Sequence, residues 1–272
     1  MRDRDDHYRL DDLRRFGVDL ASRLGVDPAR ASSFVSSLLW YDAAAAAIFG
    51  IACLPDWLDA IARGEVDPKS GGTIRRETTA TAVLDGETGI GPLILARAGQ
   101  VAQEKAREVG VGVVRVEGLG RVGPSADVAA AIALGPMIGT VLGPGSSWST
   151  AVPVAETVPA AFDTALGGAG PGPPPWSIGT LPAWTFPFGA EGGWAVVAAS
   201  VGAFEPLAAF HARVDGLLKG ASPTAGEVRP EAWRAGRDDH LARGLALPRP
   251  ALDALKAAGD RLGVAWPGPI GR

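Results

Sequence analysis

The sequence has few of the side chains that bind metals or form disulfides. Its 272 residues include one cysteine, Cys53, and three histidines, His7, His211 and His240. A single cysteine excludes an internal disulfide framework and a zinc ribbon held by cysteines. The histidines are too far apart along the chain for a local HxxxH metal site. We therefore expect no metal ion in this protein.

An excess of positive charge is also absent. The sequence has 26 Lys and Arg residues against 30 Asp and Glu residues, which gives a formal net charge of -4. Proteins that bind nucleic acid through its phosphates carry a basic surface, whereas the pI here is about 5.5. No nucleic-acid partner is expected. The low net charge, together with a mean hydropathy of +0.14, excludes global disorder.

No apolar run is long enough to cross a bilayer. The most apolar stretch, residues 43–54, has about a dozen residues, whereas a membrane-spanning helix needs roughly 20. Residues 1–9 are dense in both charges and cannot form the apolar core of a signal peptide. We expect a cytoplasmic protein without a membrane partner.

Glycine and proline are abundant, at 37 and 22 residues, and they mark the ends of many predicted elements. In the first third, apolar residues recur at helical spacing and prolines stand near predicted helix starts. From residue 78 onward, short β-branched runs alternate with helical patterns, which predicts an α/β layer with some parallel pairing. The predicted helices are 10–24, 28–39, 54–64, 91–110, 125–134, 204–218, 230–243 and 250–262, and the predicted strands are 79–84, 111–116, 137–142 and 193–199.

A G-x-G-x-x-G sequence at Gly118–Gly123 lies between a predicted strand and a predicted helix, as in a dinucleotide-binding turn. Two observations weigh against that interpretation. The next strand ends at Gly143 without the acidic residue that would hold a ribose, and the motif follows the second predicted strand rather than the first. Chance occurrence in a glycine-rich chain competes with it. An anion-binding helix N-terminus at 124–126 is the other alternative.

The order and spacing of several segments resemble the type-2 malate/L-lactate dehydrogenase family. That family includes ureidoglycolate and sulfolactate dehydrogenases and the reductases of cyclic imino acids. The longest of the segments is Ile74–Gly91, with the sequence IRRETTATAVLDGETGIG. The others are 54–64, 104–112, 113–116, 202–204, 228–231 and 243–247.

This resemblance implies a non-Rossmann, sulfolactate dehydrogenase-like α/β fold, truncated here. A helical layer from both chain ends would join a central α/β sheet domain. The implied parts are an N-terminal helical part at 1–75, a shortened α/β domain at 76–205 with a Gly/Pro loop at 167–175, and C-terminal helices at 206–272 that pack with the N-terminal part. Members of the family pass hydride between NAD or NADP and a 2-oxo acid or imine, usually as homodimers.

The sequence departs from the family at the positions that carry its chemistry. The Ser-His-Gly motif falls on Ile48, Phe49 and Gly50, and the arginine that follows it falls on Cys53. The His-Phe-Gly motif falls on Arg121-Val-Gly, and the Thr-Asn pair falls on or beside Gly143-Pro144. An aspartate–alanine–threonine–serine strand and a glycine–lysine–glycine cofactor segment are expected to be deleted near 167–175.

These departures remove the group that would donate a proton. Reduction of a carbonyl or imine needs a proton donor near neutral pH, a task that suits histidine. Ile48 and Phe49 cannot donate a proton, and Arg121 is always protonated, so it can stabilise an anion but cannot shuttle a proton. With the cofactor segment also missing, no NAD or NADP is expected.

The leading hypothesis is therefore an enzyme that has lost hydride transfer and catalyses cyclisation, isomerisation or elimination on a biosynthetic intermediate in secondary metabolism. Its substrate pocket would contain Ile48, Phe49, Cys53 and Arg121, and its catalytic pair would be Arg121 and Glu117. Two alternatives stay open. One is a divergent NAD(P)H-dependent reductase of a 2-oxo acid or imine, and the other is a non-catalytic binding or scaffold subunit. The expected partners are a small-molecule substrate and a second copy in a homodimer.

Overall fold

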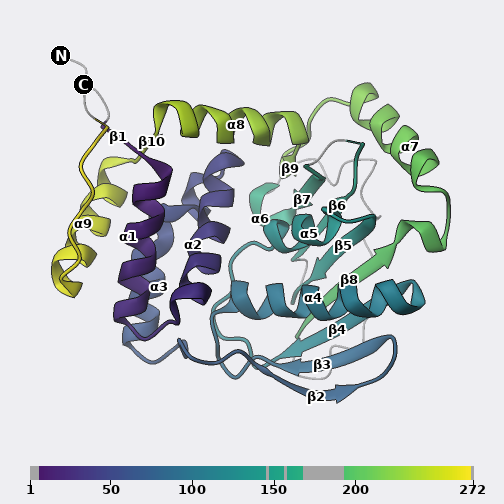
Figure 1. Cartoon of the computed structure of the whole chain (residues 1–272), viewed down its shortest axis with the longest axis horizontal. Coiled ribbons are helices and arrows are strands. Elements are labelled where there is room, and N and C mark those ends of the chain that lie inside the picture. Colours follow the sequence, from purple (N-terminus) through teal and green to yellow (C-terminus); the bar gives the residue numbers. More distant parts are fainter. Residues whose placement is uncertain (1–5, 145–146, 156–157, 168–192, 271–272) are drawn as a thin grey trace. The chain divides into compact units, whose positions relative to one another are not determined.

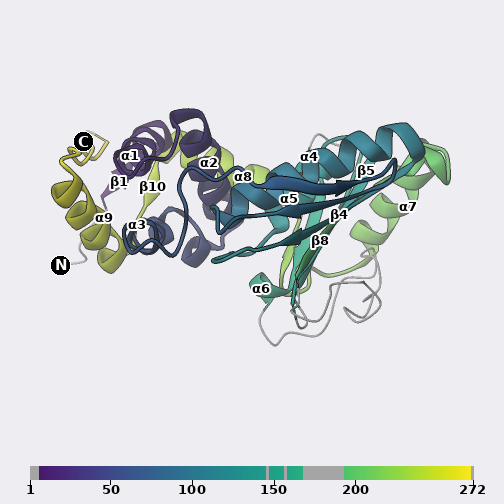
Figure 2. The same cartoon turned by 90° about the horizontal axis from the view of Figure 1, so that it is seen from below.

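The computed structural model describes residues 6–144, 147–155, 158–167 and 193–270 (Figures 1 and 2). The chain forms two compact units, which are Met1–Lys69 together with Glu231–Arg272, and Ser70–Pro230. In the part of the chain so described, no helix is both long enough and apolar enough to cross a bilayer.

The first unit is built from helices of both chain ends, as the sequence predicts. Short strands from the two ends also pair antiparallel, β1 (His7–Tyr8) with β10 (Leu245–Ala246). Two 3-10 turns, η1 (Ala47–Phe49) and η2 (Ile51–Cys53), connect the second helix to the third. The helices are α1 (Leu10–Arg23), α2 (Pro28–Ala43), α3 (Leu54–Ala62), α8 (Pro230–Arg243) and α9 (Arg249–Leu262).

Local sequence explains where these helices begin and end. The Asp27 carboxylate accepts hydrogen bonds from the N–H groups of Ala29 and Arg30, at 3.0 and 3.3 Å, and so caps α2. Gly263 adopts a left-handed φ of 67° and ends α9. After it, the Trp266 ring packs edge-on against Phe16 of α1 at 4.8 Å between ring centres, which fixes the C-terminal segment to the helical core.

The second unit contains a sheet of eight strands among the described residues, in the order β2-β3-β4-β8-β5-β6-β7-β9. The β3–β4 pair is parallel, which confirms the prediction of some parallel pairing, and the other pairs are antiparallel. The strands are β2 (Thr73–Glu77), β3 (Thr81–Asp85), β4 (Val111–Glu117), β5 (Met137–Leu142), β6 (Trp148–Val152), β7 (Ala160–Asp163), β8 (Trp194–Ser200) and β9 (Glu227–Val228).

Two helices lie close against the sheet because glycines face them. A Cβ atom at Gly112 of β4 would collide with the Ala102 carbonyl of α4 (Gly91–Val109). A Cβ atom at Gly139 of β5 would collide with the Ala129 carbonyl of α5 (Ala126–Ala133) and would lie 2.8 Å from the Ile132 Cβ. Figure 2 shows α4 and α5 along the same face of the sheet.

The remaining helical elements of the second unit follow β7 and β8. They are α6 (Thr164–Gly167), η4 (Val201–Ala203) and α7 (Leu207–Gly220). Phe210 and Val214 of α7 join the apolar cluster of Val152 and Phe162, so α7 packs on the sheet of its own unit.

The domain division inferred from sequence, with boundaries at residues 75 and 205, stays a prediction. The two compact units are defined by contacts within the folded chain, which do not test which parts fold together. Residues 168–175 of the Gly/Pro loop lie outside the described residues.

A buried carboxylate fastens β7 to the start of α5. Asp163 is 1% exposed, and its carboxylate accepts hydrogen bonds from the N–H groups of Ser125 and Ala165, both at 2.7 Å. The Ser125 hydroxyl in turn lies 2.8 Å from the Ser149 hydroxyl of β6. Burial raises the pKa of Asp163 to about 6, although its backbone donors oppose the shift.

Asp163 should therefore make the stability of the protein depend on pH. The pKa of its carboxyl rises from 3.8 to about 6 on folding, so the folded state retains a proton that the unfolded chain releases. This contribution to stability is complete below pH 3.8 and is lost as the pH rises through about 6. Asparagine at this position cannot ionise. The difference in unfolding free energy between the wild type and Asp163→Asn should fall by about 1–3 kcal/mol from pH 4 to pH 7.

Urea denaturation at a series of pH values measures that difference. Asp253→Asn is a matched control, because the Asp253 side chain is 63% exposed. A difference between Asp163→Asn and the wild type that is constant across the pH range would contradict the assignment.

Candidate functional site

Three of the residues predicted to line a pocket lie on the turn between α2 and α3. Ile48 and Phe49 are in η1, and Cys53 ends η2. The Ile48 side chain is 77% exposed, whereas Phe49 is half-buried with its ring 6.4 Å from that of Tyr41. The Cys53 thiol donates to the carbonyl of Gly50 at 3.1 Å, so it closes η2.

The same turn is held by a residue that the sequence analysis missed. Asp42, in the last turn of α2, is 4% exposed, and its Oδ2 atom accepts a hydrogen bond from the Ile51 N–H at 2.9 Å. A Cβ atom at Gly50 would collide with Oδ1 of this carboxylate and would lie 2.6 Å from Oδ2. Gly50 is therefore required for packing against Asp42. One signal was available, because Asp42 is the only charged residue between Arg30 and Asp56.

The Asp42 carboxyl has an unusual environment. Burial raises its pKa from 3.8 to about 7, and the Ile51 N–H lowers it only in part. Oδ1 is shielded from solvent and has no hydrogen-bond partner among the described residues. A buried acid that exchanges its proton near neutral pH thus lies directly beneath the turn.

The predicted catalytic pair lies in the second unit. Glu117 ends β4, and its carboxylate forms an ion pair with Arg115, two residues earlier on the same face of the strand. Arg121 is exposed on the loop that leads to α5. The pocket that would join Arg121 to Ile48, Phe49 and Cys53 stays a prediction, because these residues belong to different units.

The first glycine of the G-x-G-x-x-G sequence has a structural role. Gly118 adopts a left-handed φ of 62°, and a Cβ atom there would lie 2.6 Å from Oδ1 of Asp85. Its carbonyl accepts a hydrogen bond from the Thr88 N–H at 2.8 Å, which ties the loop to the turn after β3. A Cβ atom at Gly123 would have nothing within 4 Å. The left-handed conformation of Gly118 and its close approach to the Asp85 side chain explain this glycine without a bound nucleotide.

The helix N-terminus at 124–126 binds a carboxylate of the chain itself. This position was one alternative for anion binding, and the anion bound there is the carboxylate of Asp163. Within the described residues, no group of three or more His, Cys, Asp or Glu side chains is arranged to hold a metal ion.

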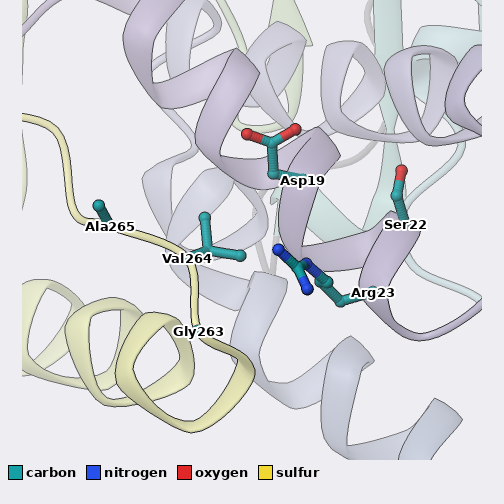
Figure 3. Close-up of a pocket in the computed structure, with 6 residues that line it drawn as sticks. All are labelled: Asp19, Ser22, Arg23, Gly263, Val264 and Ala265. Carbon is teal, nitrogen blue, oxygen red and sulfur yellow. The ribbon is translucent and has the colours of Figure 1, made fainter.

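A cavity of about 400 Å³ lies in the first unit, away from the residues that the sequence analysis selected (Figure 3). Figure 3 shows the Arg23 side chain extending from α1 toward Val264. The charged residues of the cavity, Asp19 and Arg23, are exposed at the surface. The lining residues are Asp19, Ser22, Arg23, Gly263, Val264 and Ala265.

Known proteins match the chain in both sequence and fold. L-sulfolactate dehydrogenase from Methanocaldococcus jannaschii is 33% identical over 97 residues, which is 36% of this chain and 28% of that protein. Malate dehydrogenase from Pyrococcus abyssi is 31% identical over 106 residues, which is 39% of this chain and 29% of that protein. The matched segments thus span less than a third of the length of these curated relatives.

The fold match is more extensive. The structure of malate dehydrogenase from Pyrococcus horikoshii superposes with a TM-score of 0.80 over 96% of each chain, at 18% sequence identity. Sulfolactate dehydrogenase from Methanocaldococcus jannaschii superposes with a TM-score of 0.75 over 95% of this chain and 98% of that one, at 19% identity. The predicted sulfolactate dehydrogenase-like α/β fold is confirmed.

A family model described as malate/L-lactate dehydrogenase matches residues 8–166. The matched region includes β7, so a strand that ends on an aspartate, Asp163, is present within it. The deletion near 167–175 stays a prediction, because the match ends at residue 166. Because the match covers more than half of the sequence, the chain belongs to the malate/L-lactate dehydrogenase family.

Proposed function

We propose that this member of the family acts on a small molecule without transferring hydride. The reaction would be a cyclisation, isomerisation or elimination on a biosynthetic intermediate in secondary metabolism. The observation that carries the proposal is the pair Ile48 and Phe49, which stand where the resemblance places serine and histidine. Neither side chain can donate the proton that reduction of a carbonyl or imine requires.

The shape and surface of that turn support the proposal. Asp42 and Gly50 hold the turn in a defined conformation although its polar side chains have been replaced. The replacement at Ile48 is 77% exposed, so the turn presents apolar surface to solvent. Exposed apolar surface suits a more apolar ligand than a small hydroxy acid.

The described residues do not fit a dinucleotide at α5. The N–H of Ser125 is bonded to the Asp163 carboxylate, and a diphosphate at this helix N-terminus would meet that buried acid. Gly118 is accounted for by its packing against Asp85. The proposed reactions conserve oxidation state, so they require no hydride donor or acceptor.

The charged side chains near α5 are the groups that would bind the substrate and stabilise charge during the proposed reaction. The Arg121 guanidinium is always charged and exposed, so it can bind a substrate carboxylate or stabilise an oxyanion. Glu117, whose side chain is 40% exposed and paired with Arg115, would be the second polar group. A homodimer and a cytoplasmic location remain part of the proposal.

A second candidate function is NAD(P)H-dependent reduction of a 2-oxo acid or imine. It is favoured by the family match, which continues through β7 and its terminal Asp163. The third possibility, a non-catalytic binding or scaffold subunit, predicts neither cofactor binding nor turnover.

Titration with NADH and NADPH separates the first two functions. The chain has 8 tryptophans, whose fluorescence a bound nicotinamide would quench. We expect no saturable quenching by either cofactor up to about 1 mM, a Kd at which binding is worth only about 4 kcal/mol. A malate dehydrogenase of the same family is the positive control. Saturable binding with a micromolar Kd would contradict the non-redox proposal and support the reductase.

Substitution of Arg121 separates an enzyme from a scaffold. A strain that lacks this chain should accumulate the substrate, and the wild-type chain should restore the product. Arg121→Ala should lower product formation by about 100-fold, because it removes a charge that stabilises the developing anion. Arg107→Ala, an exposed arginine on α4, is the matched control and should restore the product fully. Full restoration by Arg121→Ala, measured by mass spectrometry, would remove Arg121 from the reaction.

A further inference from the structure

Asp42 is buried in a way that an ionised carboxylate tolerates poorly. It is 4% exposed, and one of its oxygens has no hydrogen-bond partner among the described residues. The other oxygen receives a single backbone N–H, from Ile51 at 2.9 Å. A buried carboxylate is stable when several donors or a cation compensate its lost hydration, and Asp42 has one neutral donor.

No charged side chain compensates Asp42. The causes of its shifted pKa are burial and the Ile51 N–H, with no contribution from a neighbouring charge. Within the turn, residues 44–53, the one titratable side chain is Cys53, whose thiol donates to the Gly50 carbonyl. From α8, Gly236 packs against the Ala43 carbonyl, and the adjacent Arg237 pairs with Asp238.

On the α3 and α9 sides, the charged groups pair with each other. Arg261 of α9 binds the Asp59 carboxylate of α3 at 2.7 Å. Arg249 and Asp253 form a second pair within α9, at 3.8 Å. Neither pair contributes to the pKa of Asp42, so the protonation of Asp42 depends on its burial.

The turn that covers Asp42 is built from short segments and contains a residue in an unfavourable backbone conformation. Residues 44–53 leave α2 through Ala45, which has a left-handed φ of 57°, a strained conformation for a residue other than glycine. The turn consists of two short 3-10 segments, η1 and η2, joined at Gly50. Such segments have few internal hydrogen bonds, so local opening costs less than unfolding of a helix.

We infer that Asp42 is a proton-dependent latch, whose neutral carboxyl holds the 44–53 turn closed and whose ionisation favours an open turn. The closed turn packs Gly50 on the carboxyl and holds the Ile51 N–H, whereas the open turn lets water reach the carboxylate. The proton released on opening passes to solvent, and no covalent bond changes. If the proposed function holds, the latch would change how far Phe49, which is half-buried in the closed turn, is exposed to substrate.

The direction of the pH response follows from the two protonation states. The carboxyl has a pKa of about 7 when the turn is closed and an ordinary value near 3.8 when it is open to water. Opening is therefore hardest in acid and becomes about tenfold easier per pH unit between those two values. Above about pH 7 the dependence ends, because the carboxyl is then ionised in both states.

Hydrogen exchange of the full chain at pH 5 and pH 8, corrected for the intrinsic exchange rate, tests the latch without any substrate. We expect the protection of the Ile51 amide to fall at least tenfold from pH 5 to pH 8 in the wild type. Asp42→Asn keeps an acceptor for that N–H but cannot ionise, so its protection should be the same at both pH values. Asp260→Asn, an exposed acid on α9, should behave like the wild type.

Equal protection of Ile51 at the two pH values in the wild type would overturn the proposal. If Asp42→Asn does not fold, the carboxyl carbon of Asp42 in the wild type decides the question by NMR. A midpoint at or above pH 6 supports the latch, and a midpoint below pH 6 overturns it. Neither measurement depends on turnover, so failure of the latch and failure of the proposed function can be distinguished.

Discussion

Strand β8 holds the second unit together, because it pairs with β4 on one side and with β5 on the other. Six residue pairs join it to each neighbour, from Val111↔Ala199 to Val116↔Trp194 and from Met137↔Ser200 to Leu142↔Ala195. Without β8, the β2-β3-β4 group under α4 would be separate from the β5-β6-β7-β9 group under α5. The glycines at 112 and 139 then let both helices lie close against the completed sheet.

Two buried carboxylates hold loops that the strand pairing does not position. Asp163 joins the end of β7 to the start of α5, and Asp42 holds the turn between α2 and α3. Asp163 accepts hydrogen bonds from two backbone N–H groups and Asp42 from one, and each acid has a raised pKa because these donors do not fully compensate its burial. Loops of this protein are thus positioned by acids whose protonation changes between mildly acidic and neutral pH.

Much of the fold was predictable because its elements carry strong local signals. The α4 helix begins at Gly91-Pro92 and ends at Gly110 with φ 89°, as the sequence indicates. Strands β2, β6 and β7 were not predicted, because none of them alternates between buried and exposed residues. β2 is a largely exposed edge strand with two arginines, and all four residues of β7 are buried, so neither strand shows the alternation that marks a half-buried strand. The central position of β8 depends on pairing between distant segments, which local patterns do not encode.

The catalytic pair of Arg121 and Glu117 stays a prediction. The structure adds that Glu117 forms an ion pair with Arg115, a neighbour relation that the two-residue period of a strand could have suggested. Asp42 could not be assigned a role from sequence, because its importance comes from the way the turn folds back over it. Its isolation within a long uncharged stretch was the one available signal.

We propose that the fold of a dehydrogenase family persists here without hydride transfer. NADH and NADPH deuterated at either face of C4, mixed with the chain and a panel of 2-oxo acids and cyclic imines, test this proposal. Mass spectrometry of the products then reports transfer of deuterium. We expect no deuterium in any product beyond that found without protein. Transfer of deuterium from one face of either cofactor, at a rate proportional to the concentration of the chain, would contradict it.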